Sequence, residues 1–475
     1  MGKKRLIIIG GVAAGMSAAA KARRTNPDLE IVVYERSGYV SYGACGFPYF
    51  IKGEVARLDD LIARTPAQMA AQGVTVHVQH EVVAIDAAQK RVRVRDLAVG
   101  REFDDRWDRL IIAAGASVQK PAIPGMGLAG VFTLRTVEDA VAIRRWLLTE
   151  RPRRGVIIGA GYIGLEMAEA LAAHGVAVTV VDAAAQVMPT LDEEMAAHVL
   201  AALQAQGVAV CLQQPVQTLV GATLVREIVR KVAAELQRRQ EGIALAGDGR
   251  LRVREVITKG QTFPADVVIV GIGGRPNVAL AQAAGIALGP TRAIAVDRQQ
   301  RTNIPDIWAA GAVAEAHSLV TGAPTYHPLA QTASKQGRVA GVNAAGGAAE
   351  FGGVVGTAVV KAFDLTIAHT GLSEKQARTL GYDAASVVIQ AESRAHYMPG
   401  HAPIHVKLVY DKSSQRVLGA QMVGADGVAK RIDVVAAALH AGWGVGNLAE
   451  LDLSYAPPYA PVWDPILIAA RVALR

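Results

Sequence analysis

Two glycine-rich turns, each placed between a short apolar run and an alanine-rich stretch, restrict the fold of this chain more than any other feature. The first is GGVAAG at 10–15 and the second is GAGYIG at 159–164. In a strand–turn–helix unit, such glycines let a pyrophosphate approach the backbone, and the N–H groups of the helix N-terminus bind it. One such motif is often accidental, whereas two in this setting predict two dinucleotide sites. The residues concerned are Gly10, Val12, Ala13, Ala14 and Gly15, and then Gly159, Gly161, Tyr162, Ile163 and Gly164.

Each turn has an acidic partner, because Glu35 and Asp182 end the apolar runs that follow the two turns. A carboxylate at that place binds a ribose hydroxyl. Val12 replaces the usual second glycine, which makes the first motif the less specific of the two. Residues 183–185 are all alanine, so nothing basic follows Asp182 to neutralise a 2′-phosphate. The second site is therefore predicted to prefer NADH, with NADPH still possible.

The remaining pattern predicts the fold class. Continuous apolar runs alternate with helical stretches up to about residue 345, which is typical of parallel sheets covered by helices on both faces. After about Gly353 the runs lie closer together, and a helix is expected at Ala429–Ala441. We therefore expect an α/β protein with two Rossmann-like dinucleotide-binding domains and a C-terminal α+β domain.

Composition excludes several classes of protein. The 50 basic and 42 acidic residues give a net charge of +8, which suits an anionic ligand. The basic residues are spread along the chain with few aromatics between them, which disfavours a nucleic-acid partner. With only two cysteines and no CxxC pair, neither a disulfide-stapled secreted protein nor a metal site is predicted. No run reaches the roughly 18 apolar residues that span a membrane, and we expect a cytoplasmic protein.

Two dinucleotide sites in one chain predict electron transfer between two cofactors, because a simple dehydrogenase needs only one. Nicotinamide gives up a hydride, whereas a thiol–disulfide couple takes its electrons through a carrier, and a flavin fills that role. The sequence therefore predicts an oxidoreductase that uses NADH and FAD.

Several longer segments resemble a known family. They are VSYGACGFPY at 40–49, LIIAAGA at 110–116, VGIGGRPN at 270–277, TNIPDIWAAG at 302–311, KQGRVAG at 335–341, KRIDV at 430–434 and SYAPPYAPVWDP at 454–465. Over nearly its whole length the chain resembles the single-cysteine branch of the pyridine nucleotide–disulfide oxidoreductases, and within it the coenzyme A disulfide reductases. The resemblance implies an FAD-binding domain at 1–120 and 278–345, an NAD(P)H-binding domain at 121–277 with a helical insertion near 224–240, and a dimerisation domain at 350–475.

Cys45 is the candidate redox residue. Relatives with two redox cysteines have CxxxxC, but here the residue five places after Cys45 is Phe50. Cys45 must therefore bond to the substrate's own sulfur or oxidise to a sulfenic acid. The surrounding glycines and Pro48 indicate a turn into a helix, whose N-terminus would lower the pKa of the thiol. The alternative is a buried core cysteine, which is how we interpret Cys211 in its apolar run.

The resemblance also implies the chemistry and further site residues. Coenzyme A disulfide would be reduced through a mixed disulfide with Cys45, in a homodimer whose Tyr397 and Tyr455 reach Cys45 from the other subunit and protonate the leaving thiolate. Tyr162 would cover the flavin until nicotinamide displaces it, or would be a hydrophobic filler. Further cofactor-binding positions are Arg36, Ser41, Ala114, Gly115, Glu166, Gly273, Gly311 and Ala312. Arg23, Arg24, Lys430 and Arg431 would meet the coenzyme's phosphates, or form an ordinary solvated surface.

Departures from the family leave rival functions open. Ala312 stands where the family has an aspartate on the flavin's ribityl chain, so weaker FAD binding is expected, and a flavin-poor NADH-binding sensor is one alternative. Ala13 stands where the oxidases and peroxidases have a histidine, which disfavours, without eliminating, an NADH oxidase. A persulfide or polysulfide reductase would use the same site. Its commonest form adds a rhodanese domain, and this chain ends at Arg475 without one, so coenzyme A disulfide is the leading expectation.

Overall fold

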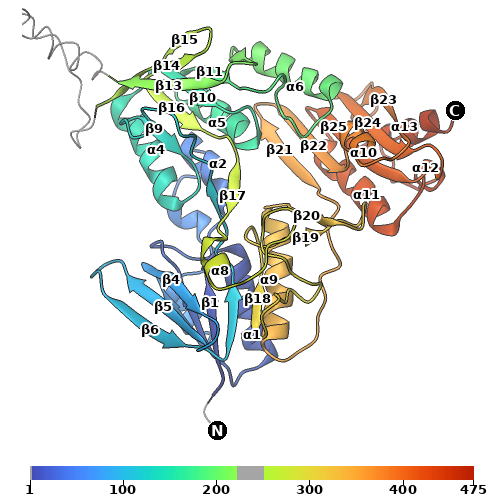
Figure 1. Ribbon diagram of the computed structural model, residues 1–475. Helices are drawn as coiled ribbons and strands as arrows, with labels where there is room; N and C mark the ends of the chain where they lie inside the picture. Colours follow the sequence, from blue (N-terminus) through green and yellow to red (C-terminus); the bar gives the residue numbers. More distant parts are fainter. Residues whose placement is uncertain (1–2, 222–250) are drawn as a thin grey trace, which may run out of the picture. The chain divides into compact units, whose positions relative to one another are not determined.

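The computed structural model describes residues 3–221 and 251–475, and the helix expected near 224–240 lies outside them. The chain divides into two units, shown as ribbons in Figure 1. Unit 1 comprises residues 1–47, 55–117 and 274–354, and unit 2 comprises residues 48–54, 118–273 and 355–475. The predicted fold class is confirmed: each glycine turn directly follows a strand of a parallel sheet, β1 (Arg5–Ile9) or β10 (Arg154–Ile158), and an antiparallel sheet forms the C-terminal part.

Unit 1 is built on a parallel five-stranded sheet with the order β18-β7-β1-β2-β3. Its strands are β1 (Arg5–Ile9), β2 (Glu30–Tyr34), β3 (Val74–His77), β7 (Arg109–Ile112) and β18 (Ile307–Ala309). Because side chains alternate along a strand, β1 packs on both faces. Leu6 and Ile8 belong to one buried cluster and Ile7 and Ile9 to another. This is why the run reads as continuously apolar.

Helices cover one face of this sheet, and an antiparallel sheet with the order β4-β5-β6 belongs to the same unit. Gly337 and Gly341 explain the KQGRVAG motif, because a Cβ on either would lie 2.2–2.3 Å from a backbone oxygen of α1. Glycine therefore lets α9 approach the backbone of α1 closely. The elements are α1 (Ala13–Thr25), η1 (Ala44–Gly46), η2 (Leu58–Leu61), α3 (Pro66–Ala70), β4 (His80–Asp86), β5 (Arg91–Asp96), β6 (Glu102–Arg106), α8 (Ala279–Ala283) and α9 (Ala330–Ala344). Two short pairs are β8 (Ala116–Val118) with β17 (Gly274–Pro276) and β19 (Ala316–His317) with β20 (Pro324–Thr325).

The first part of unit 2 repeats the topology of unit 1. Its parallel sheet has the order β12-β11-β10-β16-β9, and a three-stranded antiparallel sheet, β13-β14-β15, lies in the chain between β12 and β16, as β4-β5-β6 lies between β3 and β7. The repeat therefore extends well beyond the two glycine turns. Its strands are β9 (Val131–Thr133), β10 (Arg154–Ile158), β11 (Ala177–Val181), β12 (Ala209–Cys211), β13 (Val216–Gly221), β14 (Val253–Thr258), β15 (Thr262–Pro264) and β16 (Val267–Val270). Its helices are α4 (Val137–Glu150), α5 (Tyr162–Ala173) and α6 (Glu193–Ala205), and α2 (Phe47–Lys52) belongs to unit 2 from Pro48 onward.

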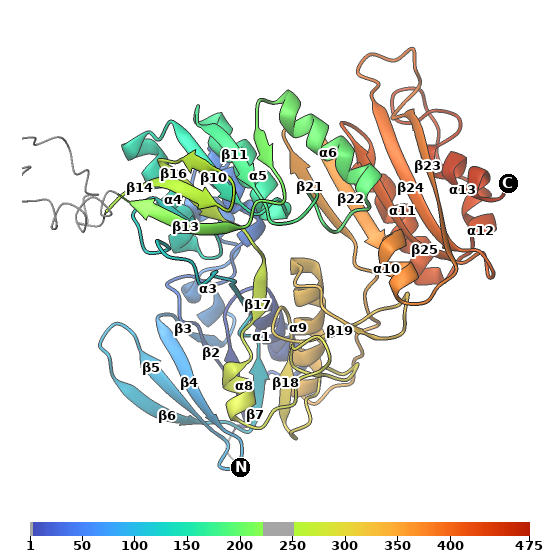
Figure 2. The same ribbon diagram turned by 45° about the horizontal axis from the view of Figure 1, so that its top comes forward.

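The C-terminal part of unit 2 is an antiparallel sheet with the order β21-β22-β25-β24-β23. Figure 2 shows α6 alongside this sheet, where it contacts β22 and β25. The strands are β21 (Ala358–Ala362), β22 (Leu365–Gly371), β23 (Ala384–Glu392), β24 (Pro403–Asp411) and β25 (Val417–Gly424). The helices are α10 (Glu374–Thr379), α11 (Val428–Ala441), α12 (Val445–Ala449) and α13 (Pro465–Ala473). Among residues 3–221 and 251–475, no helix has the length and apolarity needed to cross a membrane.

Candidate active site

The first glycine turn is held by a buried carboxylate. Gly10 has a φ of +102°, and a Cβ on it would lie 2.3 Å from the oxygen of Ala113, so only glycine fits. The Gly11 N–H donates to Oε2 of Glu35 at 2.7 Å, and the Ser37 N–H donates to Oε1 at 2.8 Å. Glu35 is 7% exposed. One side chain thus fixes both the turn and the end of β2.

The second turn has the same construction. Gly159 has a φ of +109°, and its Cβ would lie 2.6 Å from the oxygen of Gly271. The Ala160 N–H donates to Oδ2 of Asp182 at 2.6 Å, and the Ala184 N–H donates to Oδ1 at 2.8 Å. Both carboxylates therefore keep a defined place at the carboxyl edge of a parallel sheet, where dinucleotides bind.

The middle residues of the two turns show how a dinucleotide would fit. Gly161 has a φ of −89°, and nothing lies within 4 Å of the position that its Cβ would take. The protein itself therefore does not require this glycine, and the open space before α5 suits a pyrophosphate. Val12 also has a negative φ, with φ −108° and ψ −141°, so this position does not require a glycine. Both turns fit the dinucleotides that the sequence predicts.

Cys45 lies on a short turn that is tied to the first glycine turn. It is exposed, in η1 immediately before α2. The Ser41 N–H donates to the oxygen of Gly11, and the Gly43 N–H donates to the oxygen of Leu61, both at 2.8 Å. The exposed side chain excludes the alternative of a buried core cysteine at this position. Cys211 is half-buried at the end of β12.

The two candidate proton donors, far apart in sequence, come together in the structure. Tyr397 and Tyr455 are 61% and 47% exposed, and a hydrogen bond between them raises the pKa of Tyr455. The Tyr455 phenol is therefore protonated at neutral pH and is a weaker acid than an ordinary tyrosine. Because the pair belongs to unit 2 and Cys45 to unit 1, the approach of the tyrosines to Cys45 remains a prediction.

The turns at Gly311 and at Ala114–Gly115, both predicted to bind a cofactor, are fixed by residues to which the sequence alone assigned no role. Gln336 is fully buried, accepts the Gly311 N–H at 2.9 Å and donates to the oxygen of Glu315 at 2.7 Å. The side-chain amide of Asn277 donates to the oxygen of Ala114 at 2.8 Å, and the backbone N–H of Asn277 donates to the oxygen of Gly115. Gly311, Gly115 and Gly273 all have positive φ angles, which explains the glycines at these predicted positions.

We expect Ala312→Asp to tighten FAD binding. Ala312 follows the fixed Gly311 turn and is half-buried, so an aspartate there would add a charged acceptor at the position where the family has one. One such hydrogen bond corresponds to about 1.5–3 kcal/mol, or about ten- to a hundredfold in the dissociation constant. The dissociation constant of FAD is measured by titrating the apoprotein of both forms. Equal constants would show that this turn does not contact the flavin.

Helix α5 carries two glutamates with different roles. Glu169 is buried and accepts hydrogen bonds from Lys52 and Lys361, each at 2.7 Å, and from the Phe363 N–H. Burial alone would raise the pKa of Glu169, but these donors lower it. Burial, together with the charge of Glu169, raises the pKa of Glu166 to about 7. Glu166 is thus a mixture of neutral and charged forms near neutral pH, one turn of helix beyond Tyr162.

The basic candidates differ in their availability for a coenzyme. Arg23 donates to the oxygens of Pro27 and Gly73. Arg431 is 8% exposed and paired with Asp464 at 2.8 Å. Both side chains thus have a structural role in the fold. Arg24, Arg36 and Lys430 are exposed, so Arg24 and Lys430 are the better candidates for phosphate contacts.

Comparison with known proteins identifies the family. Residues 4–337 match the family described as pyridine nucleotide-disulphide oxidoreductase, and residues 357–465 match its dimerisation domain. The chain belongs to this family, and it uses FAD and NAD(P)H. The dimerisation domain supports a homodimer, and the relatives described next support a small-molecule disulfide-type substrate.

Individual relatives indicate sulfur chemistry. The NAD(P)H coenzyme A polysulfide/persulfide reductase of Pyrococcus horikoshii is 39% identical, over 99% of this chain and 98% of that protein. A coenzyme A disulfide reductase of Staphylococcus aureus is 29% identical, over 97% and 98%. The structure of an NAD-dependent persulfide reductase from A. fulgidus has a TM-score of 0.90 and 39% identity, over 99% of this chain and 83% of that one.

Proposed function

We propose that this protein is an NAD(P)H-dependent flavoenzyme that reduces a coenzyme A-linked sulfur compound through Cys45. The observation that carries the proposal is the exposed Cys45 on a turn hydrogen-bonded to the first dinucleotide loop. The chain has only one other cysteine, Cys211, which is half-buried in a different unit. A single thiol in such a place acts on a sulfur–sulfur bond of the substrate.

The residues of the chain account for each part of this chemistry. The Cys45 thiolate attacks the sulfur attached to coenzyme A, forms a Cys45–coenzyme A disulfide and expels a leaving group. That group is coenzyme A thiolate from a disulfide, or hydrosulfide from a persulfide. Tyr397 or Tyr455 of the partner subunit donates the proton that the leaving sulfur needs. FAD, when bound, supplies the carrier that passes two electrons from NAD(P)H to the mixed disulfide.

Two substrates remain candidates, and the relatives favour a persulfide or polysulfide of coenzyme A. A rhodanese domain is expected in the commonest form of such a reductase, but this does not count against the assignment, because this chain covers the P. horikoshii reductase over 98% of its length. Coenzyme A disulfide is the second candidate, supported by the S. aureus reductase at 29% identity. Oxygen is a weaker one, since Ala13 offers no ionisable side chain beside the first turn.

The test is NADH consumption measured anaerobically with equal concentrations of coenzyme A persulfide, polysulfide, coenzyme A disulfide and glutathione disulfide. We expect turnover with the two coenzyme A compounds, and little with polysulfide or glutathione disulfide, neither of which has nucleotide phosphates for Arg24 and Lys430 to contact. Turnover with glutathione disulfide alone, or NADH consumption only in a parallel aerobic assay without any sulfur compound, would remove coenzyme A-linked sulfur as the substrate.

NADH is expected to be preferred over NADPH by at least about tenfold in kcat/KM. Asp182 is fixed by the Ala160 and Ala184 N–H groups, and its charge would repel a 2′-phosphate at the edge of β11. A single unfavourable charge contact of about 1.4 kcal/mol corresponds to that factor. The measurement compares kcat/KM for both donors, with Asp182→Ala as the variant that should narrow the ratio. An NADPH preference in the natural protein would contradict the assignment of Asp182.

A further inference from the structure

Three polar side chains form a row across the C-terminal sheet. His369 of β22 lies directly opposite Gln421 of β25, and Gln421 lies directly opposite Lys407 of β24. Directly opposed residues in antiparallel strands project from the same face, so the three share one face of the sheet. Gln421 and Lys407 are each 1% exposed, and such burial of polar groups requires partners. We call these residues the polar row.

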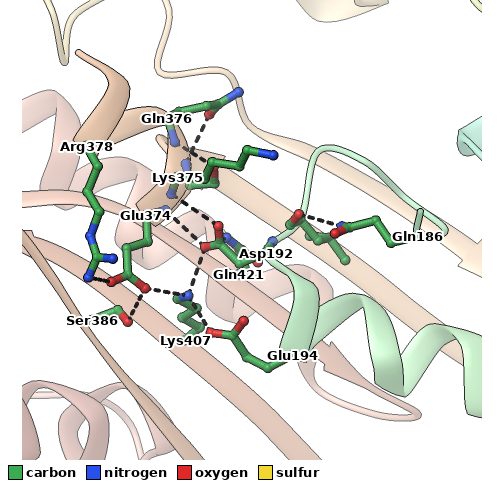
Figure 3. A network of polar contacts seen from close by, with 12 residues as sticks. Gln186, Asp192, Glu194, Glu374, Lys375, Gln376, Arg378, Ser386, Lys407 and Gln421 are labelled. Atoms are coloured by element: carbon green, nitrogen blue, oxygen red, sulfur yellow. Dashed lines mark hydrogen bonds and ion pairs between the residues drawn. The ribbon is translucent and has the colours of Figure 1, made fainter. Parts of the chain in front are cut away.

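The partners come from the loop that follows Asp182 in the second dinucleotide-binding fold. Gln421 accepts the Asp192 N–H at 2.8 Å and donates to Oδ2 of Asp192 at 2.7 Å. The Lys407 ammonium lies 3.0 Å from the same carboxylate. Figure 3 shows Asp192 among these side chains, with Glu194 and Glu374 on the other sides of Lys407. The loop at 183–192 is thus fixed at its far end by the C-terminal sheet.

The third member of the polar row reaches the glycine turn itself. Nε2 of His369 is hydrogen-bonded to the hydroxyl of Tyr162, and the Tyr162 and Thr190 hydroxyls lie 3.3 Å apart. Tyr162 is the first residue of α5, directly after the open space at Gly161. Burial raises the pKa of Tyr162, so the phenol stays protonated and can donate. Through Tyr162, the end of the second glycine turn is therefore hydrogen-bonded to both the 183–192 loop and the C-terminal sheet.

We propose that His369 is a positioning residue for NADH, which holds the ring of Tyr162 at the entrance of α5 and thereby orders the second dinucleotide turn. The sequence suggested a flavin cover or a filler for Tyr162, and the structure gives its hydroxyl a specific partner from another domain. The inference rests on the NADH-dependent half of the proposed function only, because it involves neither Cys45 nor the sulfur substrate.

The experiment measures flavin reduction by NADH in an anaerobic stopped-flow instrument, without any sulfur compound. The dependence of the rate on NADH concentration gives an apparent Kd and a limiting rate. We expect His369→Phe, which keeps an aromatic ring but loses the hydrogen bond, to raise the apparent Kd about two- to tenfold, the range for one buried hydrogen bond. His369→Gln, which retains a polar group near the place of Nε2, should restore most of the affinity.

A matched control separates positioning from general packing. His405 is on the same face of β24 as Lys407 and stacks on His198 of α6, with 3.6 Å between the ring centroids. His405→Phe should leave the apparent Kd for NADH unchanged. The double variant Tyr162→Phe/His369→Phe should raise the Kd for NADH no more than the larger of the two single substitutions does. The reason is that both substitutions remove the same hydrogen bond, the one between Tyr162 and His369. An unchanged or lower Kd in His369→Phe, or single effects that multiply in the double variant, would overturn the proposal.

Failure of this proposal is distinguishable from failure of the proposed function. If no sulfur compound is reduced but His369→Phe weakens NADH binding as expected, only the substrate assignment fails. If sulfur reduction is normal and His369→Phe reduces its flavin as the natural protein does, only the role of His369 fails.

Discussion

Cys45→Ser should lose sulfur reduction by at least about a thousandfold while its flavin is still reduced by NADH. Replacement of a covalent nucleophile has effects of this size or larger, and a serine hydroxyl cannot form the disulfide that the reaction requires. Flavin reduction should survive because Cys45 belongs to a separate turn, and the contacts of Glu35 and Asp182 with their own turns do not involve it. The two rates are measured separately, by steady-state turnover and by stopped flow.

The matched control for this variant is Cys211→Ser. Cys211 ends β12 and is half-buried, beside Val181 in the sheet register. Its loss should leave sulfur turnover within about twofold of the natural protein, with at most a small loss of stability. Normal turnover by Cys45→Ser, or an equal loss in both variants, would contradict the single-cysteine mechanism.

Lys407→Met is expected to destabilise unit 2 by about 3–5 kcal/mol, the usual result of leaving buried carboxylates without their cation. Lys407 is 1% exposed and lies within ion-pair distance of three carboxylates, those of Asp192, Glu194 and Glu374. Burial alone would lower the pKa of Lys407, but hydrogen bonds to these groups raise it. The shift is measured as a change in the urea midpoint. Lys412→Met, at an exposed lysine 3.9 Å from Asp383, should change stability by less than about 0.5 kcal/mol.

The carboxylates around Lys407 also predict how the stability difference between the natural protein and Lys407→Met depends on pH. Burial would raise the pKa values of Asp192 and Glu374, but hydrogen bonds and Lys407 lower them from ordinary values of 3.8 and 4.5. Groups with a depressed pKa stabilise the fold above their unfolded values and lose this effect as the pH falls through the folded ones. The natural protein should therefore lose stability below about pH 4.5. The deficit of Lys407→Met should be largest near pH 7 and shrink on acidification.

The fold and the cofactor turns could be predicted from the sequence because their requirements are local. A φ of +102° at Gly10 and of +109° at Gly159 requires glycine, and the carboxylates of Glu35 and Asp182 are each at the end of a strand that the apolar pattern reveals. These signals fall within short segments, so a single sequence contains them. The exposure of Cys45 follows in the same way from its glycine-flanked turn.

The polar row could not be predicted, because its members are paired only through the register of the C-terminal sheet. His369, Gln421 and Lys407 stand on three different strands, and nothing in their local sequence differs from an ordinary solvated position. Lys407 alternates with Ile404, Val406 and Leu408 of β24, a pattern that indicates a solvated lysine on the opposite face, whereas the structure buries it. Likewise, the hydrogen bond of Arg23 to the oxygen of Gly73 and the ion pair of Arg431 with Asp464 join residues far apart in the sequence, so the sequence alone does not reveal them.

The central claim, that the substrate's sulfur is bonded to Cys45 during turnover, is tested most directly by mass spectrometry of the trapped protein. The enzyme, with its flavin oxidised and Cys45 as the free thiol, is treated anaerobically with one equivalent of coenzyme A disulfide, quenched in acid, digested and searched for a coenzyme A adduct. The account predicts the adduct on the peptide that contains Cys45, and its loss when NADH is added before the quench. An adduct confined to Cys211, or one on Cys45 that NADH does not remove, would contradict the account.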